Sequence, residues 1–445
     1  MNSQAPITPE NASERIARVM FPDVYPIIVD LERSEGNRLY DSRGGRYFLD
    51  CFSYVASNPI GHNHPKMFDS AFEKKLLRAA RNKPSSSDFY TLEKAEFVDA
   101  FERLAMPAYM RHLFLVEGGA VAVENAMKAA FDWKVRLNLR AGAKDERGSK
   151  IIHFQEAFHG RCGYTLSVTN TADPRKTKYF PKFDWPRITN PKISFPLDES
   201  STKAVAALEA KALEEIDHAF QIHGDDIAAI ILETIQGEGG DNQFRREFHH
   251  ALRKVADERN VMLIYDEIQS GCGLTGKMWA VEHYGIEPDI ICFGKKTQVC
   301  GMMLTRRIEE VENHVFAEAS RINSTWGGNL VDMVRAQRYL EVIHEERLVE
   351  NARDVGAYLI QSLHSLQEGF PRILSNARGL GLMCAIDAST IALRDQIVQA
   401  VYERGAIILK CGVNSLRFRP ALIFTRSDVD NLTGILTDAL RSVSA

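Results

Sequence analysis

An acidic residue and a lysine each follow a predicted buried strand in the middle of the chain. The first strand is the apolar run 261–265, which ends on Asp266, and the second is 289–293, which is followed by Gly294 and Lys295. Apolar runs without polar alternation are typical of a parallel sheet that is covered on both faces. Because ligands bind beyond the carboxyl ends of the strands in such sheets, Asp266 and Lys295 are candidates for chemistry.

An acid and a lysine at neighbouring strand ends match what pyridoxal 5'-phosphate (PLP) requires. A lysine amine attaches this cofactor as a Schiff base, and an acid pairs with the pyridinium nitrogen so that the ring can accept electrons. Acids and lysines are also common at the strand ends of α/β surfaces, where they only face solvent. The pair alone does not separate these two interpretations, so the surrounding sequence has to decide between them.

The sequence between and around Asp266 and Lys295 resembles that of the class III (fold type I) aminotransferases. The segments DEIQSGCGLTGK (266–277) and PDIICFGKK (288–296) follow the order of that family's signature. The resemblance implies that Asp266 pairs with the PLP ring nitrogen and that Gln269 binds the 3-oxygen. The spacing from Asp289 selects Lys295 as the catalytic lysine that carries PLP, whereas counting back from Gly301 selects Lys296.

Other cofactor residues are predicted from the same resemblance. Strand, glycine-rich turn and helix succeed one another near Gly119 and Ala120, and such a helix start binds phosphate through free backbone N–H groups. The family carries a hydroxyl residue where this chain has Ala120. Phe158, in an aromatic-His-Gly triplet, is expected to cover the cofactor ring. Thr325 is expected to reach the PLP phosphate of a neighbouring subunit, which implies a homodimer with shared active sites.

Three charged residues are candidates for substrate binding. Arg417 lies in a segment that resembles the family's carboxylate-binding arginine, and Arg161 follows the aromatic-His-Gly triplet. Glu238 lies in a glycine-rich stretch, which predicts a flexible loop, and we expect it to neutralise Arg417 when a substrate presents no carboxylate there. Relatives usually have proline where this chain has Thr234.

The substrate prediction also comes from resemblance. Leu274, the run 295–301 and the segments FPKFDWPR (180–187) and NSTWGGN (323–329) are similar to the family members that act on L-lysine. Those members pass its ε-amino group to 2-oxoglutarate by a ping-pong mechanism, giving 2-aminoadipate 6-semialdehyde and L-glutamate. Two alternatives stay open: another ω-aminotransferase, with ornithine, acetylornithine or 4-aminobutyrate as donor, and a catalytically silent homologue.

The elements that must position these residues predict an α/β protein of fold type I. A chain of 445 residues is too long for one compact core. We predict a large PLP-binding domain (66–331) with a mostly parallel central sheet, and a smaller α+β domain (332–445). An N-terminal arm and hairpin (1–65) are predicted to belong to the small domain.

Composition excludes several other classes of function. The net charge of −4 gives no electrostatic footprint for nucleic acid, and no apolar run approaches the length of a membrane span. Seven scattered cysteines without a CxxC spacing indicate reduced thiols in a cytoplasmic protein. The segment GHNHP (61–65) holds two histidines but no third ligand nearby, so we interpret it as a structural loop and expect no metal.

Overall fold

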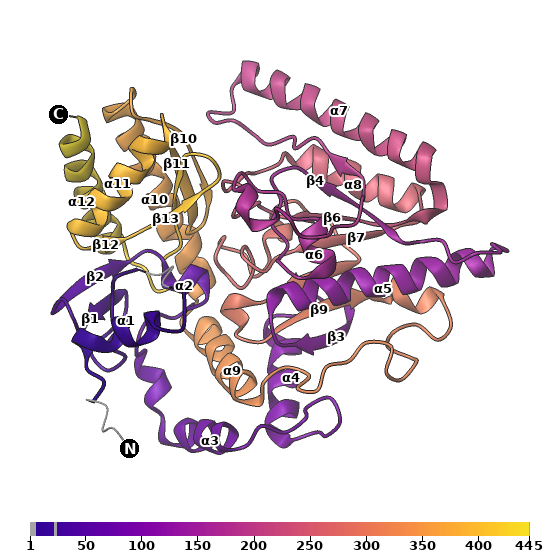
Figure 1. Ribbon diagram of the computed structural model, residues 1–445, viewed down its shortest axis with the longest axis horizontal. Helices are drawn as coiled ribbons and strands as arrows, with labels where there is room; N and C mark the ends of the chain where they lie inside the picture. The colour runs from indigo at the N-terminus through magenta and orange to yellow at the C-terminus, as the bar shows by residue number, and fades with distance from the viewer. Residues whose placement is uncertain (1–5, 22–24, 445) are drawn as a thin grey trace.

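The computed structural model describes residues 6–21 and 25–444, and its centre is a seven-stranded sheet (Figure 1). Its strands run parallel except for β9, which is antiparallel to both neighbours. In spatial order the strands are β3 (Met110–Val116), β9 (Cys300–Thr305), β8 (Ile290–Phe293), β7 (Met262–Asp266), β6 (Ile227–Glu233), β4 (Lys150–Phe154) and β5 (Arg187–Ile188). The expected mostly parallel central sheet is therefore confirmed.

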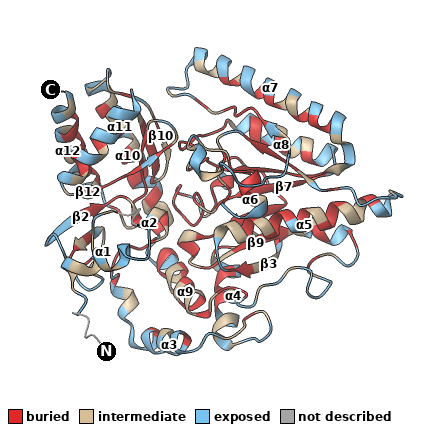
Figure 2. Cartoon of the chain, in the orientation of Figure 1, coloured by how far each residue is buried: buried red, intermediate tan, exposed pale blue. Residues whose placement is uncertain are grey.

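The central strands are buried on both faces because helices cover each side (Figure 2). On β6, Ala229 and Ile231 pack into the core beneath α5 (Gly119–Arg140). The alternate residues Ile230 and Leu232 belong to the core on the opposite face, which is closed by α7 (Glu199–His223) and α8 (Arg246–Glu258). Two apolar faces on one strand explain the uninterrupted apolar runs in the sequence.

The register of the parallel strands places the predicted catalytic residues at one edge of the sheet. Glu233 at the end of β6 is paired with Asp266 at the end of β7, and Asp266 is paired with Cys292 on β8. The chain leaves β8 at Phe293, so Lys295 follows at the same edge. The strand ends thus place an acid and a lysine side by side, as the sequence predicts.

The strand β9 was not predicted from the sequence. A 3-10 turn at Lys295–Thr297 and a left-handed Gln298 (φ +59°) reverse the chain there. The reversal returns residues 300–305 antiparallel between β3 and β8, where both edges of the strand are paired.

A second region, on the left in Figure 1, contains two smaller sheets. One holds the hairpin β1 (Arg38–Asp41) and β2 (Arg46–Asp50) with β12 (Ala406–Ile407), and β2 runs parallel to β12. The other holds, in order, β10 (Leu374–Leu380), β11 (Met383–Ala388), β14 (Ser415–Phe418) and β13 (Leu409–Cys411). On the strength of the β2–β12 pairing we propose that segments 1–65 and 332–445 form one small domain, of which residues 1–5, 22–24 and 445 lie outside the described residues.

Helices complete both regions. They are α3 (Ser70–Arg81), α4 (Leu92–Leu104), α9 (Leu330–Glu345), α10 (Leu348–Gly369), α11 (Ile391–Glu403) and α12 (Arg426–Ser444), with short turns α2 (Ser53–Ala56) and α6 (Gly163–Ser167). The N-terminal helix α1 (Pro9–Ala17) begins where Thr8 and Asn11 form a capping box and Pro9 follows the cap. None of the described helices is both long and apolar enough to cross a membrane.

The histidines of the GHNHP segment have structural partners. His62 lies 2.9 Å from the Asp50 carboxylate and His64 lies 3.2 Å from Glu346. The described residues contain no cluster of three side chains suited to a metal ion.

Candidate active site

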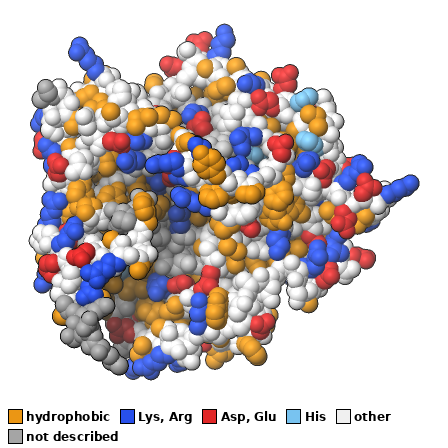
Figure 3. All heavy atoms as spheres, viewed as in Figure 1, with side chains coloured by type: hydrophobic (Ala, Val, Ile, Leu, Met, Phe, Trp, Pro, Cys, Tyr) orange, Lys and Arg blue, Asp and Glu red, His pale blue; other side chains and the backbone are white. Residues whose placement is uncertain are grey.

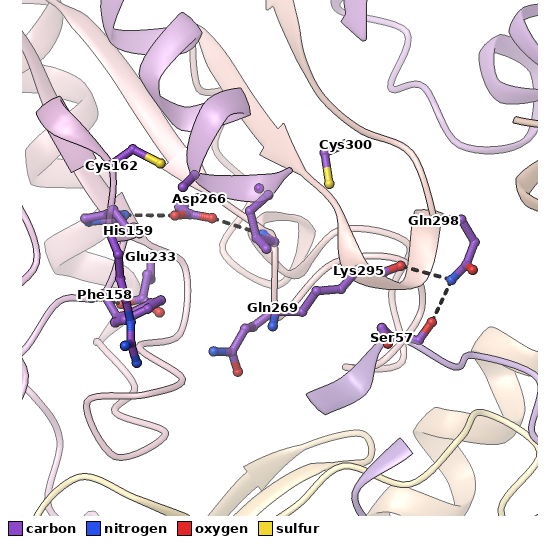
Figure 4. A pocket seen from close by; sticks show the side chains of 15 residues that line it. Ser57, Phe158, His159, Cys162, Glu233, Asp266, Gln269, Lys295, Gln298 and Cys300 are labelled. Atoms are coloured by element: carbon purple, nitrogen blue, oxygen red, sulfur yellow. Dashed lines mark hydrogen bonds and ion pairs between the residues drawn. The ribbon is translucent and has the colours of Figure 1, made fainter. Parts of the chain in front are cut away.

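A cavity of about 610 Å³ opens at the carboxyl edge of the central sheet (Figure 4). Strand ends form its floor, and the start of α5 and the segment after β4 form its walls. Among the residues predicted for the site, the lining includes Gly119, Ala120, Phe158, Arg161, Asp266, Gln269 and Lys295. In the space-filling view this face of the molecule is hollowed between its two regions (Figure 3).

Asp266 is fixed by two contacts at the end of β7. One carboxylate oxygen lies 2.8 Å from Nδ1 of His159, and the other accepts the backbone N–H of Ile268 at 3.0 Å. Both side chains are buried, and His159 Nε2 has no partner among the described residues. This contact orients the carboxylate towards the cavity. His159 was predicted only as a member of the aromatic-His-Gly triplet, without a role of its own.

A second carboxylate, that of Glu233, lines the same cavity and was not predicted as a site residue. It accepts the backbone N–H groups of Phe158 at 2.8 Å and Gly237 at 3.0 Å. Burial, reinforced by the charge of Asp266, raises the pKa of Glu233 well above its usual value. Glu233 therefore holds the aromatic segment and the glycine-rich segment in place around the cavity.

The two adjacent lysines point into different surroundings. Lys295, in a left-handed conformation (φ +54°), lines the cavity, and burial together with Arg417 lowers its pKa. Lys296 is fully buried, its Nζ donates to the carbonyl of Gln269 at 2.7 Å, and burial lowers its pKa to about 7. Lys295 is thus the lysine whose amine is accessible from the cavity, and Lys296 supports the backbone behind it.

The start of α5 offers free backbone donors to the cavity. Its N-cap is Gly118 (φ +97°), and in the described structure no side chain caps this helix end. A Cβ at Gly160 would lie 2.5 Å from the Cβ of Ala120, so the chain segments approach closely here. Cys300, which sequence reasoning missed, lies against the backbone N–H groups of Gly118 and Lys295, and burial raises the pKa of its thiol. A helix end of this kind binds a phosphate.

These residues fit PLP. A buried carboxylate (Asp266), an amine (Lys295), an aromatic ring (Phe158) and an uncapped helix start line one cavity. Gln269 also faces it, and its Oε1 has no partner among the described residues. Gln269 would bind the 3-oxygen of the cofactor by donating its side-chain N–H to it.

Glu238 and Arg417 meet beside the cavity rather than in its lining. Arg417 Nη2 donates to Glu238 Oε2 at 2.9 Å, and Arg417 is buried with Nε and Nη1 unpartnered among the described residues. The other oxygen, Oε1, contacts Lys176, a residue that the sequence analysis did not single out. Burial acts to raise the pKa of Glu238, but the two cations outweigh it and hold that pKa below its usual value.

The loop that carries Glu238 is packed, contrary to the flexibility predicted from its glycines. A Cβ at Gly237 would lie 2.4 Å from Gln269, and one at Gly239 would lie 2.3 Å from the Glu156 carbonyl. The carbonyl of Glu238 also accepts the Gly412 N–H at 2.9 Å. Glycine is needed here for the close approach of this loop to its neighbours.

Two predicted residues lie at the margin of the site. Arg161 is exposed at the cavity wall, 6.0 Å from the centre of the Phe158 ring. Thr325 is exposed and does not line the cavity; its carbonyl accepts the hydroxyls of Ser85 and Ser87.

Thr234, which replaces the usual proline, donates its hydroxyl to buried Glu267 at 2.9 Å. That bond gives the departure a structural role.

Comparisons with known proteins agree with this geometry. Residues 19–440 match the family described as Aminotransferase class-III. The chain is 48% identical over 440 residues to the L-lysine-epsilon aminotransferase of Mycobacterium tuberculosis (99% of this chain, 97% of that protein). It is 46% identical to the enzyme of the same name from Amycolatopsis lactamdurans (96% and 95% covered).

A solved structure of lysine aminotransferase from M. tuberculosis superposes with a TM-score of 0.96 at 48% identity. The match covers 98% of this chain and all of that one. Fold and sequence agree over nearly the full length. The chain belongs to the class III aminotransferases and is a PLP-dependent enzyme of fold type I.

Proposed function

We propose that this enzyme transfers the ε-amino group of L-lysine to 2-oxoglutarate. The products are 2-aminoadipate 6-semialdehyde and L-glutamate, formed in two half-reactions that share one cavity. Similarity to lysine aminotransferases over the whole chain supports the donor. The observation that carries the proposal is the ion pair of Glu238 with Arg417 beside the cavity, because an amine donor with a neutral chain near the cofactor requires that arginine to be neutralised.

The residues that would hold PLP are those of the strand ends and the α5 start. When bound, PLP supplies an electron sink that stabilises negative charge on the carbon next to the transferred nitrogen. Asp266, oriented by His159, keeps the ring nitrogen protonated, because an adjacent carboxylate favours the protonated form. Gly119 and Ala120 offer backbone N–H groups to the phosphate.

In the lysine half-reaction, the Lys295 amine moves a proton from the ε-carbon of the substrate to the cofactor. This amine reaches the cavity, and its lowered pKa makes the neutral, basic form more accessible. Glu238 stays on Arg417 and cancels its charge. Arg161, exposed at the cavity wall, binds the α-carboxylate at the far end of lysine.

In the 2-oxoglutarate half-reaction, Arg417 binds the carboxylate beside the keto carbon. Its Nε and Nη1, unpartnered among the described residues, are donors for this role, and Glu238 moves off Nη2. Lys295 returns the proton in the reverse direction. One arginine therefore serves two unlike substrates through the position of one carboxylate.

We further propose a cytoplasmic homodimer in which Thr325 completes the partner's phosphate site. The exposed position of Thr325, outside the cavity of its own chain, supports this arrangement. All seven cysteines are free, which supports a reducing compartment.

Product identification tests the proposal. PLP-loaded enzyme is incubated with 2-oxoglutarate and L-lysine, ornithine, N-acetylornithine or 4-aminobutyrate in separate reactions. We expect glutamate and 2-aminoadipate 6-semialdehyde from lysine at the highest rate. A higher rate with another donor would assign a different ω-aminotransferase, and no turnover of any donor would indicate a catalytically silent homologue.

A further inference from the structure

Lys176 is a partly buried cation that contacts the substrate end of the site and has no role in the proposed function. It ends the short turn η2 (Pro174–Lys176), which lies outside the sheet and outside the sequence motifs from which the site residues were predicted. Its side chain is only 15% exposed. Its Nζ bonds Oε1 of Glu238 and lies 5.6 Å from the centre of the Phe158 ring, so it contacts two site residues.

Glu238 bridges two cations with separate oxygens. Oε1 is bound to Lys176, and Oε2 accepts from Arg417 at 2.9 Å. Each oxygen has its own partner, so the carboxylate can leave Arg417 by rotation without leaving Lys176. The packed glycine loop supports this, because Gly237 and Gly239, on either side of Glu238, lie in close contact with Gln269 and with the Glu156 carbonyl.

We propose that Lys176 is a positioning residue that retains the Glu238 carboxylate while Arg417 binds the carboxylate of the oxo acid. Lys176 thereby sets the affinity of the site for dicarboxylate acceptors. The inference deepens the proposed function, and it rests on the exchange of Glu238 for a substrate carboxylate at Arg417.

The charge balance of the three side chains favours this role. Lys176, Glu238 and Arg417 carry a net charge of +1, and a bound substrate carboxylate brings it to zero. Without Lys176, the same bound state would hold two carboxylates against one guanidinium. Glu238 is 23% exposed and Arg417 is 4% exposed, so water screens little of that excess negative charge.

The lysine half-reaction does not need Lys176 in this way. There Glu238 stays on Arg417, and the pair is neutral with or without a third charge. Loss of Lys176 should therefore impair the 2-oxoglutarate half-reaction and leave the lysine half-reaction nearly unchanged.

A binding experiment with glutarate, an unreactive five-carbon dicarboxylate, tests the inference without turnover. Calorimetry measures its dissociation constant on PLP-loaded wild type, Lys176→Met, Lys176→Arg and Lys178→Met. Lys178 lies two residues away on the same loop, is exposed and contacts Tyr179, so it is the matched control. We expect Lys176→Met to weaken glutarate about fivefold to tenfold and the other two variants to stay within about twofold, as for a partly buried ion pair.

A Glu238→Gln background separates the proposal from direct binding of the ligand by Lys176. There is then no displaced carboxylate to retain, so Lys176→Met should change glutarate binding by less than about twofold. An equal loss in both backgrounds would show that Lys176 binds the dicarboxylate itself and would overturn the inference. So would unchanged binding in Lys176→Met alone.

Single turnovers give the matching kinetic result. Lys176→Met should raise the 2-oxoglutarate concentration needed for half-maximal rate and leave the lysine half-reaction within about twofold. A selective loss with lysine would contradict the inference. If wild type does not react with lysine at all, the proposed donor is wrong, while the glutarate comparison still tests Lys176.

Discussion

The two ends of the active site are built in different ways. At the cofactor end, Asp266 and Lys295 follow strand ends whose positions the sheet register determines, and His159 holds the carboxylate at 2.8 Å. At the substrate end, Glu238 belongs to a loop and Arg417 to β14, and their side chains meet in an ion pair at 2.9 Å.

This difference matches two chemical needs. A cofactor that stays bound through both half-reactions requires one fixed arrangement of donors and charges. A cavity that accepts two unlike substrates in turn requires one charge that can be presented and withdrawn. The backbone provides the first, and we propose that rotation of the Glu238 carboxylate provides the second.

Removing the catalytic amine should have the largest effect on the fixed end. Lys295→Ala should reduce turnover at least about a thousandfold, because it removes both the point of cofactor attachment and the proton carrier. Borohydride reduction and peptide mapping of wild type should find the label on Lys295. A pyridoxyl group on Lys296 would reverse the assignment of the two lysines.

A neutral replacement of the strand-end acid comes next. Asp266→Asn should keep the cofactor bound but reduce turnover about a hundredfold, because the amide cannot hold the ring nitrogen protonated. Cofactor content from absorbance and steady-state rates separate the two effects. Near-normal turnover would mean that another group, and not Asp266, keeps the ring nitrogen of the cofactor protonated.

The movable end should respond selectively. Glu238→Ala should slow the lysine half-reaction about tenfold and change the glutamate half-reaction less than about twofold, because only lysine leaves Arg417 without a counter-charge. The absorbance change of the cofactor follows each half separately. Equal losses in both halves would remove the basis for an exchange at Arg417.

The last expected effect concerns stability and not turnover. Burial lowers the pKa of Lys296 to about 7, whereas the amine of the unfolded chain titrates near ~10.4. Between these values the unfolded chain binds a proton that the folded chain does not. The stability of wild type should therefore rise with pH over this range, by at most about 1.4 kcal/mol per pH unit from this group.

Lys296→Met lacks this proton and is the comparison for that effect. Melting temperatures of both proteins at pH 7.0 and about 9.5 give the measurement. The advantage of wild type over the variant should grow at the higher pH. A constant difference would mean that the buried amine keeps its charge.

The sequence predicted the two strand ends that carry Asp266 and Lys295, and for a physical reason. Apolar runs that end on Asp266 and before Lys295 report strand positions directly, and the parallel sheet brings their ends together. The sequence did not predict the strand β9, because the pairing of that strand depends on the rest of the fold. Residues 300–305 form the strand β9 by pairing with β3 along one edge and with β8 along the other.

The movable end was predicted in part. Glu238 and Arg417 were expected to meet, but the glycines around Glu238 were interpreted as flexibility, and they serve close packing instead. Nothing in the sequence distinguishes Lys176 from Lys178 and Lys182 on the same segment. Only the folded chain shows which of the three faces Glu238.

The most direct test of a fixed end and a movable end is a pair of crystal structures of the PLP-loaded enzyme, one with lysine and one with glutarate. We expect the Asp266–His159 contact to stay near 2.8 Å in both. The Glu238–Arg417 contact should stay near 2.9 Å with lysine. With glutarate, it should be replaced by a ligand carboxylate on Arg417, with Glu238 still on Lys176. Glu238 paired with Arg417 in both complexes would contradict the account.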